Sequence, residues 1–359
     1  MTETGIWVSG FYGSGKSSFT KYLGFALDPA RMVQGKPFLD LLCDRFSRAE
    51  IPAALRTITR RHPTAVILLD LGAEQLAESA ATTVSLVLYW KVLEWAGFSK
   101  EKKLAQLEFT LERRGKLDEF HQKYQERYKD KWEAIHNDPL LGVARAAEIV
   151  PQVLPEDFLT PESFHSLRFE EARNIRDLAG EIIDLCRRRT KRDSILFLID
   201  GAGQYVAPRG ELILNLDGLA RNLKELGQGK VWVVATGQQT LTEIVEKAAL
   251  NSAELIKLKD RFLIAIHLDA SDIREITYRR LLAKSPEGER QLTELFAAHG
   301  QALVTHTRLT ETALYKGDPD AATFARLTLF CPNTSTCCWN SSARWPDRLA
   351  ASAYGRQSV

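Results

Sequence analysis

The sequence has little net charge, no long apolar run and no cysteines at C-x-x-C spacing, and each absence argues against a class of protein. Its 48 basic and 46 acidic residues leave a formal charge of +2, so no global field draws the chain to nucleic acid or membrane. No apolar run approaches the ~20 residues of a membrane span. The odd number of cysteines and the lack of C-x-x-C pairs argue against a disulfide framework and a thiolate zinc site; they are Cys43, Cys186, Cys331, Cys337 and Cys338.

Glycines and one lysine are crowded near the start of the chain. Gly10, Gly15, Lys16 and Ser17 fit the phosphate-binding loop (P-loop) pattern G-x-x-x-x-G-K-[ST], with Gly13 as an extra glycine inside it. An apolar run precedes the pattern and residues at helical spacing follow it, so the glycines lie at a predicted strand-to-helix junction. Because this pattern begins almost at the first residue, the start of the chain does not have the character of a signal peptide, and we expect a cytoplasmic protein.

The motif predicts a role for each of its residues. Glycines let backbone N–H groups approach a ligand closely at a helix N-terminus, where the helix dipole favours an anion. Lys16 would reach the β- and γ-phosphates of ATP, and the Ser17 hydroxyl would hold Mg²⁺. Ser14 and Ser18 complete the predicted nucleotide-binding set. The alternative is a glycine-rich turn that binds nothing.

Five short apolar runs predict buried parallel strands separated by helices, which is an α/β fold with a wound sheet. The first run ends directly before the glycines, and the last run ends before residue 270. We therefore expect a nucleotide-binding domain over 1–270. The runs are Ile6–Ser9, Ala65–Leu71, Ile195–Asp200, Val231–Thr236 and Leu263–Leu268.

A long helical insertion is expected at about 84–190, between the second and third strands. Its charged, aromatic-rich part has apolar residues at spacings of three and four and is amphipathic. It is interpreted either as a helical hairpin that covers the sheet or as a surface that contacts DNA or a partner. Interleaved acidic residues favour a solvated face. The basic residues concerned are Arg113, Arg114, Lys123, Arg127, Lys129 and Lys131.

The end of the chain changes character twice. Residues 271–330 have a wholly helical pattern, with Ser271 as a candidate N-cap, and predict a small helical lid. Residues 331–359 have clustered Cys, Ser, Asn and Trp without a sustained period. A floppy tail and a frameshift in the encoding DNA near residue 327 are the two explanations for this segment.

A P-loop needs an acidic partner at the end of a nearby strand to organise Mg²⁺. Asp200 and Asp70 each close an apolar run. We prefer Asp200, because another buried strand that ends in Thr236 and Gln238 follows it; these two residues would lie beside the γ-phosphate. Asp70 is better explained as the cap of a strand-to-helix turn.

The order of these motifs resembles that of the AAA+ class of ATPases. In that class an arginine before the fifth strand often reaches the nucleotide of a neighbouring subunit, and Arg261 is the candidate for such an arginine finger. An ordinary surface arginine is the alternative. Arg279 or Arg280, at the start of the predicted lid, is a candidate for a phosphate contact within the same chain.

Four ordered blocks resemble the N-terminal part of the large ATPase of BREX phage-defence systems. They are WVSGFYGSGKSSF, LFLIDGAGQYV, GKVWVVATGQQ and KDRFLIAIHLDASDIREITYRRLLAK. The likeness covers about residues 1–330 and implies ATP binding, assembly with itself or with other defence proteins, and action near DNA. Members of that family are much longer, so this sequence resembles a fragment or a truncated relative.

One departure from the family bears on catalysis. The family normally has a glutamate directly after the acidic strand-end aspartate, where it polarises the attacking water, but this chain has Gly201. Loss of a positioned base lowers a rate by ~10²–10⁴-fold, so we expect tight ATP–Mg²⁺ binding with feeble hydrolysis. Gln204 or Glu211 could substitute, although nothing in their spacing requires it.

Three functions follow from these features. The leading hypothesis is an AAA+-type ATP-binding module that acts as an ATPase within a multi-protein defence machine. A P-loop kinase that phosphorylates a small molecule is the first alternative; the long insertion and the strand ending in Thr236 and Gln238 argue against it. A nucleotide switch that binds ATP without hydrolysing it is the second, and Gly201 favours it.

Overall fold

The computed structural model describes residues 3–74, 82–167, 174–241, 243, 258–268, 278, 282–307 and 320–327. The chain divides into two compact units, each described here by itself. The first comprises Met1–Ser9 with Gly15–His267, and the second Gly10–Ser14 with Leu268–Val359. Among the helices that the structure describes, none has the length and apolar character to cross a membrane.

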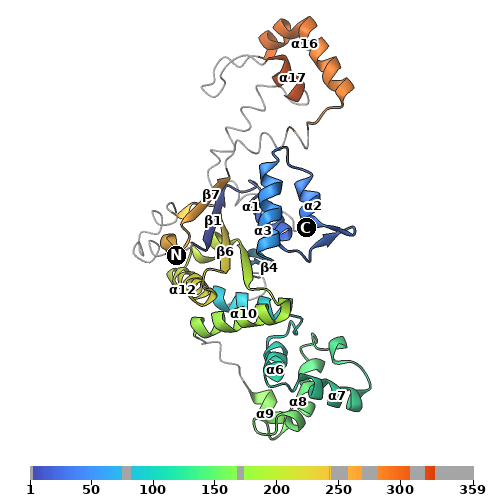
Figure 1. Cartoon of the computed structure of the whole chain (residues 1–359), viewed down its shortest axis with the longest axis vertical. Coiled ribbons are helices and arrows are strands. Elements are labelled where there is room, and N and C mark those ends of the chain that lie inside the picture. The colour runs from blue at the N-terminus through green and yellow to red at the C-terminus, as the bar shows by residue number, and fades with distance from the viewer. Residues whose placement is uncertain are drawn as a thin grey trace, which may run out of the picture. The chain divides into compact units, whose positions relative to one another are not determined.

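All five predicted strands are present and form one sheet (Figure 1). Their order across the sheet is β4-β5-β6-β1-β7. The pairs β4–β5, β5–β6 and β6–β1 are parallel. Central strands of a parallel sheet are buried on both faces and therefore read as continuous apolar runs, which is why the sequence predicts them well. The bounds are β1 Gly5–Gly10, β4 Thr64–Asp70, β5 Ser194–Asp200, β6 Val231–Gly237 and β7 Ile264–Leu268.

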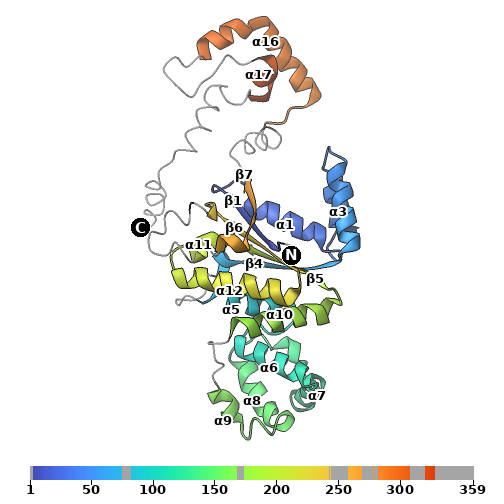
Figure 2. The ribbon, with the colours of Figure 1, turned by 60° about the vertical axis from the view of Figure 1, so that its left-hand side comes forward.

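Helices cover both faces of the sheet. Helix α1 (Lys16–Leu27) packs on β4, β5 and β6 on one face. Helices α5 (Val84–Trp95), α10 (Ile175–Thr190) and α12 (Gly210–Gly227) pack together on the other face (Figure 2). The main core lies between these helices and the sheet. In parallel α/β sheets, ligands bind at the carboxyl ends of the strands, which here is the edge where β1, β5 and β6 end.

Further helices and a small hairpin connect these main elements. Helix α4 (Leu71–Glu74) follows β4 directly, and α11 (Ala202–Val206) follows β5. Between α1 and β4 lie a small hairpin and two further helices. They are β2 Met32–Val33, β3 Lys36–Pro37, α2 Phe38–Cys43 and α3 Glu50–Arg61.

The regular elements described in the insertion are helices, but its middle part does not simply cover the sheet. Helices α6 to α9 enclose a hydrophobic core of their own, which includes Leu107, Phe120, Trp132 and Phe164. An amphipathic pattern tells which face of a helix is buried but not what it is buried against. The bounds are α6 Lys102–Arg113, α7 Leu117–Tyr128, a 3₁₀ turn Trp132–Ala134, α8 Leu141–Val153 and α9 Pro161–Ser166.

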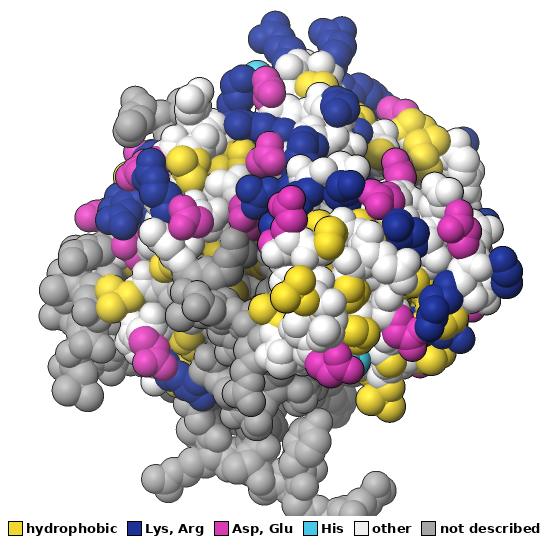
Figure 3. All heavy atoms as spheres, turned by 90° about the horizontal axis from the view of Figure 1, so that it is seen from below, with side chains coloured by type: hydrophobic (Ala, Val, Ile, Leu, Met, Phe, Trp, Pro, Cys, Tyr) yellow, Lys and Arg dark blue, Asp and Glu magenta, His cyan; other side chains and the backbone are white. Residues whose placement is uncertain are grey.

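Most of the basic residues singled out in the insertion pair with carboxylates. Arg113 pairs with Glu181 at 3.1 Å and Lys123 with Glu119 at 3.8 Å. Arg114 pairs with Asp157, and Arg127 with Glu148. Figure 3, seen from the end where α7, α8 and α9 lie in Figure 1, shows basic and acidic side chains interspersed. Paired charges of both signs agree with a solvated face, and contact of this surface with DNA or a partner stays a prediction.

The second unit contains α16 (Pro286–Thr307) and α17 (Ala321–Leu327), which pack on each other. The rings of Phe296 and Phe324 lie 5.1 Å apart in this contact. The described part of the region 271–330 agrees with its helical pattern, and its role as a lid stays a prediction. Ser271, Arg279, Arg280 and the tail 331–359 lie outside the described residues.

Candidate functional site

The connection from β1 to α1 uses glycine where the backbone requires it. Gly13 has φ +82° and Gly15 has φ +90°, both in the left-handed region that side chains disfavour. Gly15 is the N-cap of α1, which begins at Lys16, and no side chain caps this helix end. The first N–H groups of α1 therefore have no side-chain acceptor at the cap, an arrangement that suits an anion.

The serines of the motif fall into two environments. Ser14 is only 4% exposed, and its Oγ has no hydrogen-bond partner among the described residues. Its backbone N–H donates to the Phe11 carbonyl at 3.1 Å, which closes a turn. Ser17 and Ser18, on the first turn of α1, are exposed. A buried hydroxyl without a partner is rare in proteins, and an oxygen-rich ligand would satisfy it.

Lys16 and Asp200 lie close together although they are far apart in the sequence. Lys16 is 8% exposed, and burial of its ammonium lowers the pKa of Lys16 below its ordinary value. The negative charge of Asp200 opposes this shift. Burying a cation is unfavourable unless a partner compensates it, so the burial of Lys16 is a feature that folding alone does not favour.

Thr236 links Asp200 to the backbone of the next residue. The N–H of Gly201 donates to Thr236 Oγ1 at 2.8 Å, and Thr236 Oγ1–H donates to Asp200 Oδ1 at 2.7 Å. Thr236 is 1% exposed, at the end of β6 beside the end of β5. A hydroxyl can accept one hydrogen bond and donate another. Thr236 thus fixes the direction of the Asp200 carboxylate, a positioning role that the sequence pattern did not indicate.

We expect Thr236→Val to destabilise the fold by about 1–3 kcal/mol, because valine keeps the shape but leaves Gly201 N–H and Asp200 Oδ1 without their partner. Urea unfolding measures this change. Thr57→Val is the matched control, since the Thr57 hydroxyl donates only within helix α3, to the Ala53 carbonyl at 2.8 Å. Equal stability of the two variants would contradict the positioning role.

Gly201 directly follows Asp200, and its backbone conformation suits glycine. It has φ +76° and is the N-cap of α11. The two proposed substitutes, Gln204 and Glu211, are exposed on α11 and α12.

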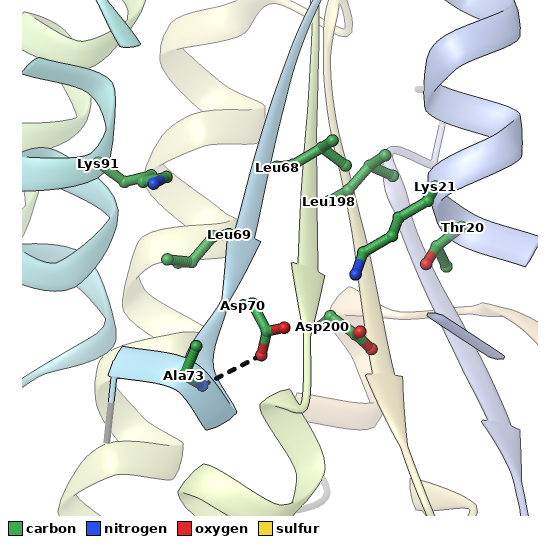
Figure 4. A pocket seen from close by; sticks show the side chains of 9 residues that line it. All are labelled: Thr20, Lys21, Leu68, Leu69, Asp70, Ala73, Lys91, Leu198 and Asp200. Carbon is green, nitrogen blue, oxygen red and sulfur yellow. Dashed lines mark hydrogen bonds between the residues drawn. The ribbon is translucent and has the colours of Figure 1, made fainter. Parts of the chain in front are cut away.

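Asp70 caps the turn after β4, as the sequence suggested. Its Oδ1 accepts from the N–H groups of Gly72 at 3.1 Å and Ala73 at 3.2 Å. Asp70 also pairs in register with Asp200 on the neighbouring strand. The two residues line one pocket together with Lys21 of α1 (Figure 4). Sequence reasoning missed this juxtaposition, and the only signal for it was that both aspartates close similar apolar runs.

Arg261 pairs with a different aspartate from the two at the strand ends, Asp70 and Asp200. Arg261 Nε donates to Asp217 Oδ1 at 3.1 Å, and Asp217 is buried on α12. A side chain on Gly5 would collide with the Arg261 carbonyl, so Arg261 lies by the start of β1, at the opposite end of that strand from the glycines. Gln238 is exposed, in the bend that follows β6.

Comparison with known proteins does not identify a family for this chain. No protein-family model and no solved structure matches the chain.

Proposed function

We propose that this chain is an ATP–Mg²⁺-binding module of the AAA+ type. The N–H groups of the loop and of the first turn of α1 would hold the phosphates, and Lys16 would contact the β- and γ-phosphates. Ser17 and Asp200 would hold Mg²⁺, which bridges and neutralises phosphate charge when it is bound. The unpartnered Oγ of Ser14 and the left-handed Gly13 and Gly15 fit such a ligand.

The burial of Lys16, in the first turn of the helix that follows the glycines and within the electrostatic influence of Asp200, is the single observation that carries this proposal. A glycine-rich turn that bound nothing would not need a lysine in a desolvated position, where its charged form is disfavoured. Triphosphate oxygens would stabilise that charge, and Mg²⁺ would engage the aspartate across from it.

The strand order supports an AAA+-like module. Numbered by their place along the chain, the five strands of the sheet lie in the order 2-3-4-1-5. The first strand is therefore flanked by the fourth and fifth, so the strand that carries the glycines adjoins the one that ends in Thr236. Together with the four sequence blocks, this order favours a cytoplasmic phage-defence ATPase of the BREX type, which would assemble with itself or with other defence proteins, with DNA as a further candidate partner.

Hydrolysis in this proposal is slow. Gly201 offers no side chain to a water molecule, and loss of such a group lowers rates by ~10²–10⁴-fold. The same observation favours a second candidate function, a nucleotide switch in which bound ATP sets a protein interface without turnover.

Arg261 keeps its proposed role as an arginine finger for a neighbouring subunit. It lies by the start of β1, at the end of that strand opposite the glycines, as a residue acting on a second copy would. Such a role requires the ion pair with Asp217 to open when a neighbour binds.

ATP binding and phosphate release by the purified chain, alone and with DNA, test the proposal, and sizing with and without nucleotide tests assembly. We expect binding of ATP–Mg²⁺ with slow release of phosphate. Binding without any release would select the switch, and no binding would refute the module.

A further inference from the structure

Position 201 carries no carboxylate, but the strand next to β5 ends in one, that of Asp70. Asp70 ends β4 and is in register with Asp200, which ends β5. Paired residues on neighbouring strands lie about 5 Å apart and project to the same face of the sheet. Figure 4 shows the two carboxylates side by side at the strand ends, and both line one pocket.

The space beside Gly201 opens onto the turn that Asp70 caps. Among the described residues, a Cβ placed on Gly201 would meet one neighbour within 4 Å, the backbone nitrogen of Gly72 at 3.5 Å. Gly72 is one of the two residues whose N–H groups bind Asp70 Oδ1. A side chain at 201 would therefore start against the same turn that carries Asp70.

The hydrogen bonds that Asp70 accepts from the described residues all use one oxygen, Oδ1. Oδ1 accepts both N–H groups of the turn, which fixes the plane of the carboxylate. In Figure 4 the other oxygen points towards Asp200 and the pocket. The ammonium of Lys21 points towards both carboxylates from α1, and its charge offsets the repulsion between two neighbouring anions.

We propose that Asp70 is the catalytic residue that orients and deprotonates the attacking water in this chain. The inference rests on the proposed function, because it deepens the account of the same site. Water oxygen forms the new bond to the γ-phosphorus, and the bond from that phosphorus to the bridging oxygen breaks. ADP keeps that bonding pair, and the proton of the water passes to Asp70 and then to solvent. The slow hydrolysis of the proposed function is thus assigned to a carboxylate on the neighbouring strand and not to a residue at position 201.

Asp70→Asn is the primary test, because the amide oxygen can still cap the turn while the basic group is lost. We expect ATP–Mg²⁺ binding to be retained and single-turnover hydrolysis to fall on the order of 10²-fold. Asp138→Asn is the matched control: Asp138 Oδ1 caps helix α8 in the same way, through Leu140 N–H at 2.9 Å and Leu141 N–H at 2.8 Å. This control should hydrolyse ATP like the wild type.

A restoring variant completes the test. Adding Gly201→Glu to Asp70→Asn supplies a carboxylate from the usual position and should recover hydrolysis, even though a side chain at φ +76° lowers stability. Asp70→Ser, which keeps an oxygen acceptor for the turn, should lose hydrolysis as Asp70→Asn does.

The failures of the two proposals are distinguishable. If the wild type binds ATP–Mg²⁺ but Asp70→Asn hydrolyses it equally fast, or if the wild type releases no phosphate at all, the role of Asp70 is refuted and ATP binding stands. If the wild type does not bind ATP, the proposed function itself fails and the role of Asp70 falls with it.

Discussion

Lys16→Met is expected to weaken ATP–Mg²⁺ binding strongly while the protein stays folded. A hydrogen bond from a charged donor contributes about 1.5–3 kcal/mol, so losing the ammonium should weaken binding by ~10–150-fold. Methionine has a similar length and is apolar, and Lys16 is 8% exposed, so the substitution also removes the penalty of desolvating a cation. Isothermal titration with ATP–Mg²⁺ and thermal unfolding measure the two effects separately.

Lys224→Met is the control for this change of charge. Lys224 is on α12, is largely buried and pairs with Glu3 at 3.0 Å, away from the strand ends. We expect this variant to bind ATP–Mg²⁺ normally and to lose some stability with its ion pair. If instead Lys16→Met unfolded the protein and Lys224→Met did not, Lys16 would be a structural residue and the binding proposal would lose its main support.

Asp200→Asn should reduce the effect of Mg²⁺ on ATP binding. The amide oxygen still accepts the hydrogen bond from Thr236 Oγ1, so the local structure should persist while the negative charge disappears. Mg²⁺ prefers carboxylate and phosphate oxygens, and losing a charged contact of this kind should weaken ATP–Mg²⁺ binding ~10-fold or more. ATP titrations with Mg²⁺ and with a chelator measure the difference.

Asp193→Asn provides the comparison for Asp200→Asn. Asp193 lies just before β5 and pairs with Lys230 at 2.8 Å on the surface. Its variant should keep the full effect of Mg²⁺. A normal Mg²⁺ effect in Asp200→Asn would mean that another group holds the metal.

The strands could be predicted from sequence because each is a buried apolar run that ends in polar residues. The five expected runs match β1, β4, β5, β6 and β7 within a residue or two. The glycines were predictable for a similar local reason: only glycine adopts the left-handed backbone readily, and Gly13 and Gly15 both do so.

Contacts between elements could not be predicted in the same way. The sequence places Asp70 and Asp200 at strand ends but does not say that β4 and β5 are neighbours. It suggested a phosphate contact for Thr236, whereas the structure shows that its hydroxyl is engaged with Asp200 and Gly201. The partner of Arg261, Asp217, lies on a helix whose packing no local pattern specifies.

The central claim is that Lys16 and Asp200 form one ATP–Mg²⁺ site, and equilibrium binding of ATP to the full chain at saturating Mg²⁺ and in its absence tests that claim most directly. The account predicts saturable binding that Mg²⁺ strengthens and that Lys16→Met weakens strongly. It would be contradicted if ATP did not bind, or if it bound equally well without Mg²⁺ and to the Lys16→Met variant.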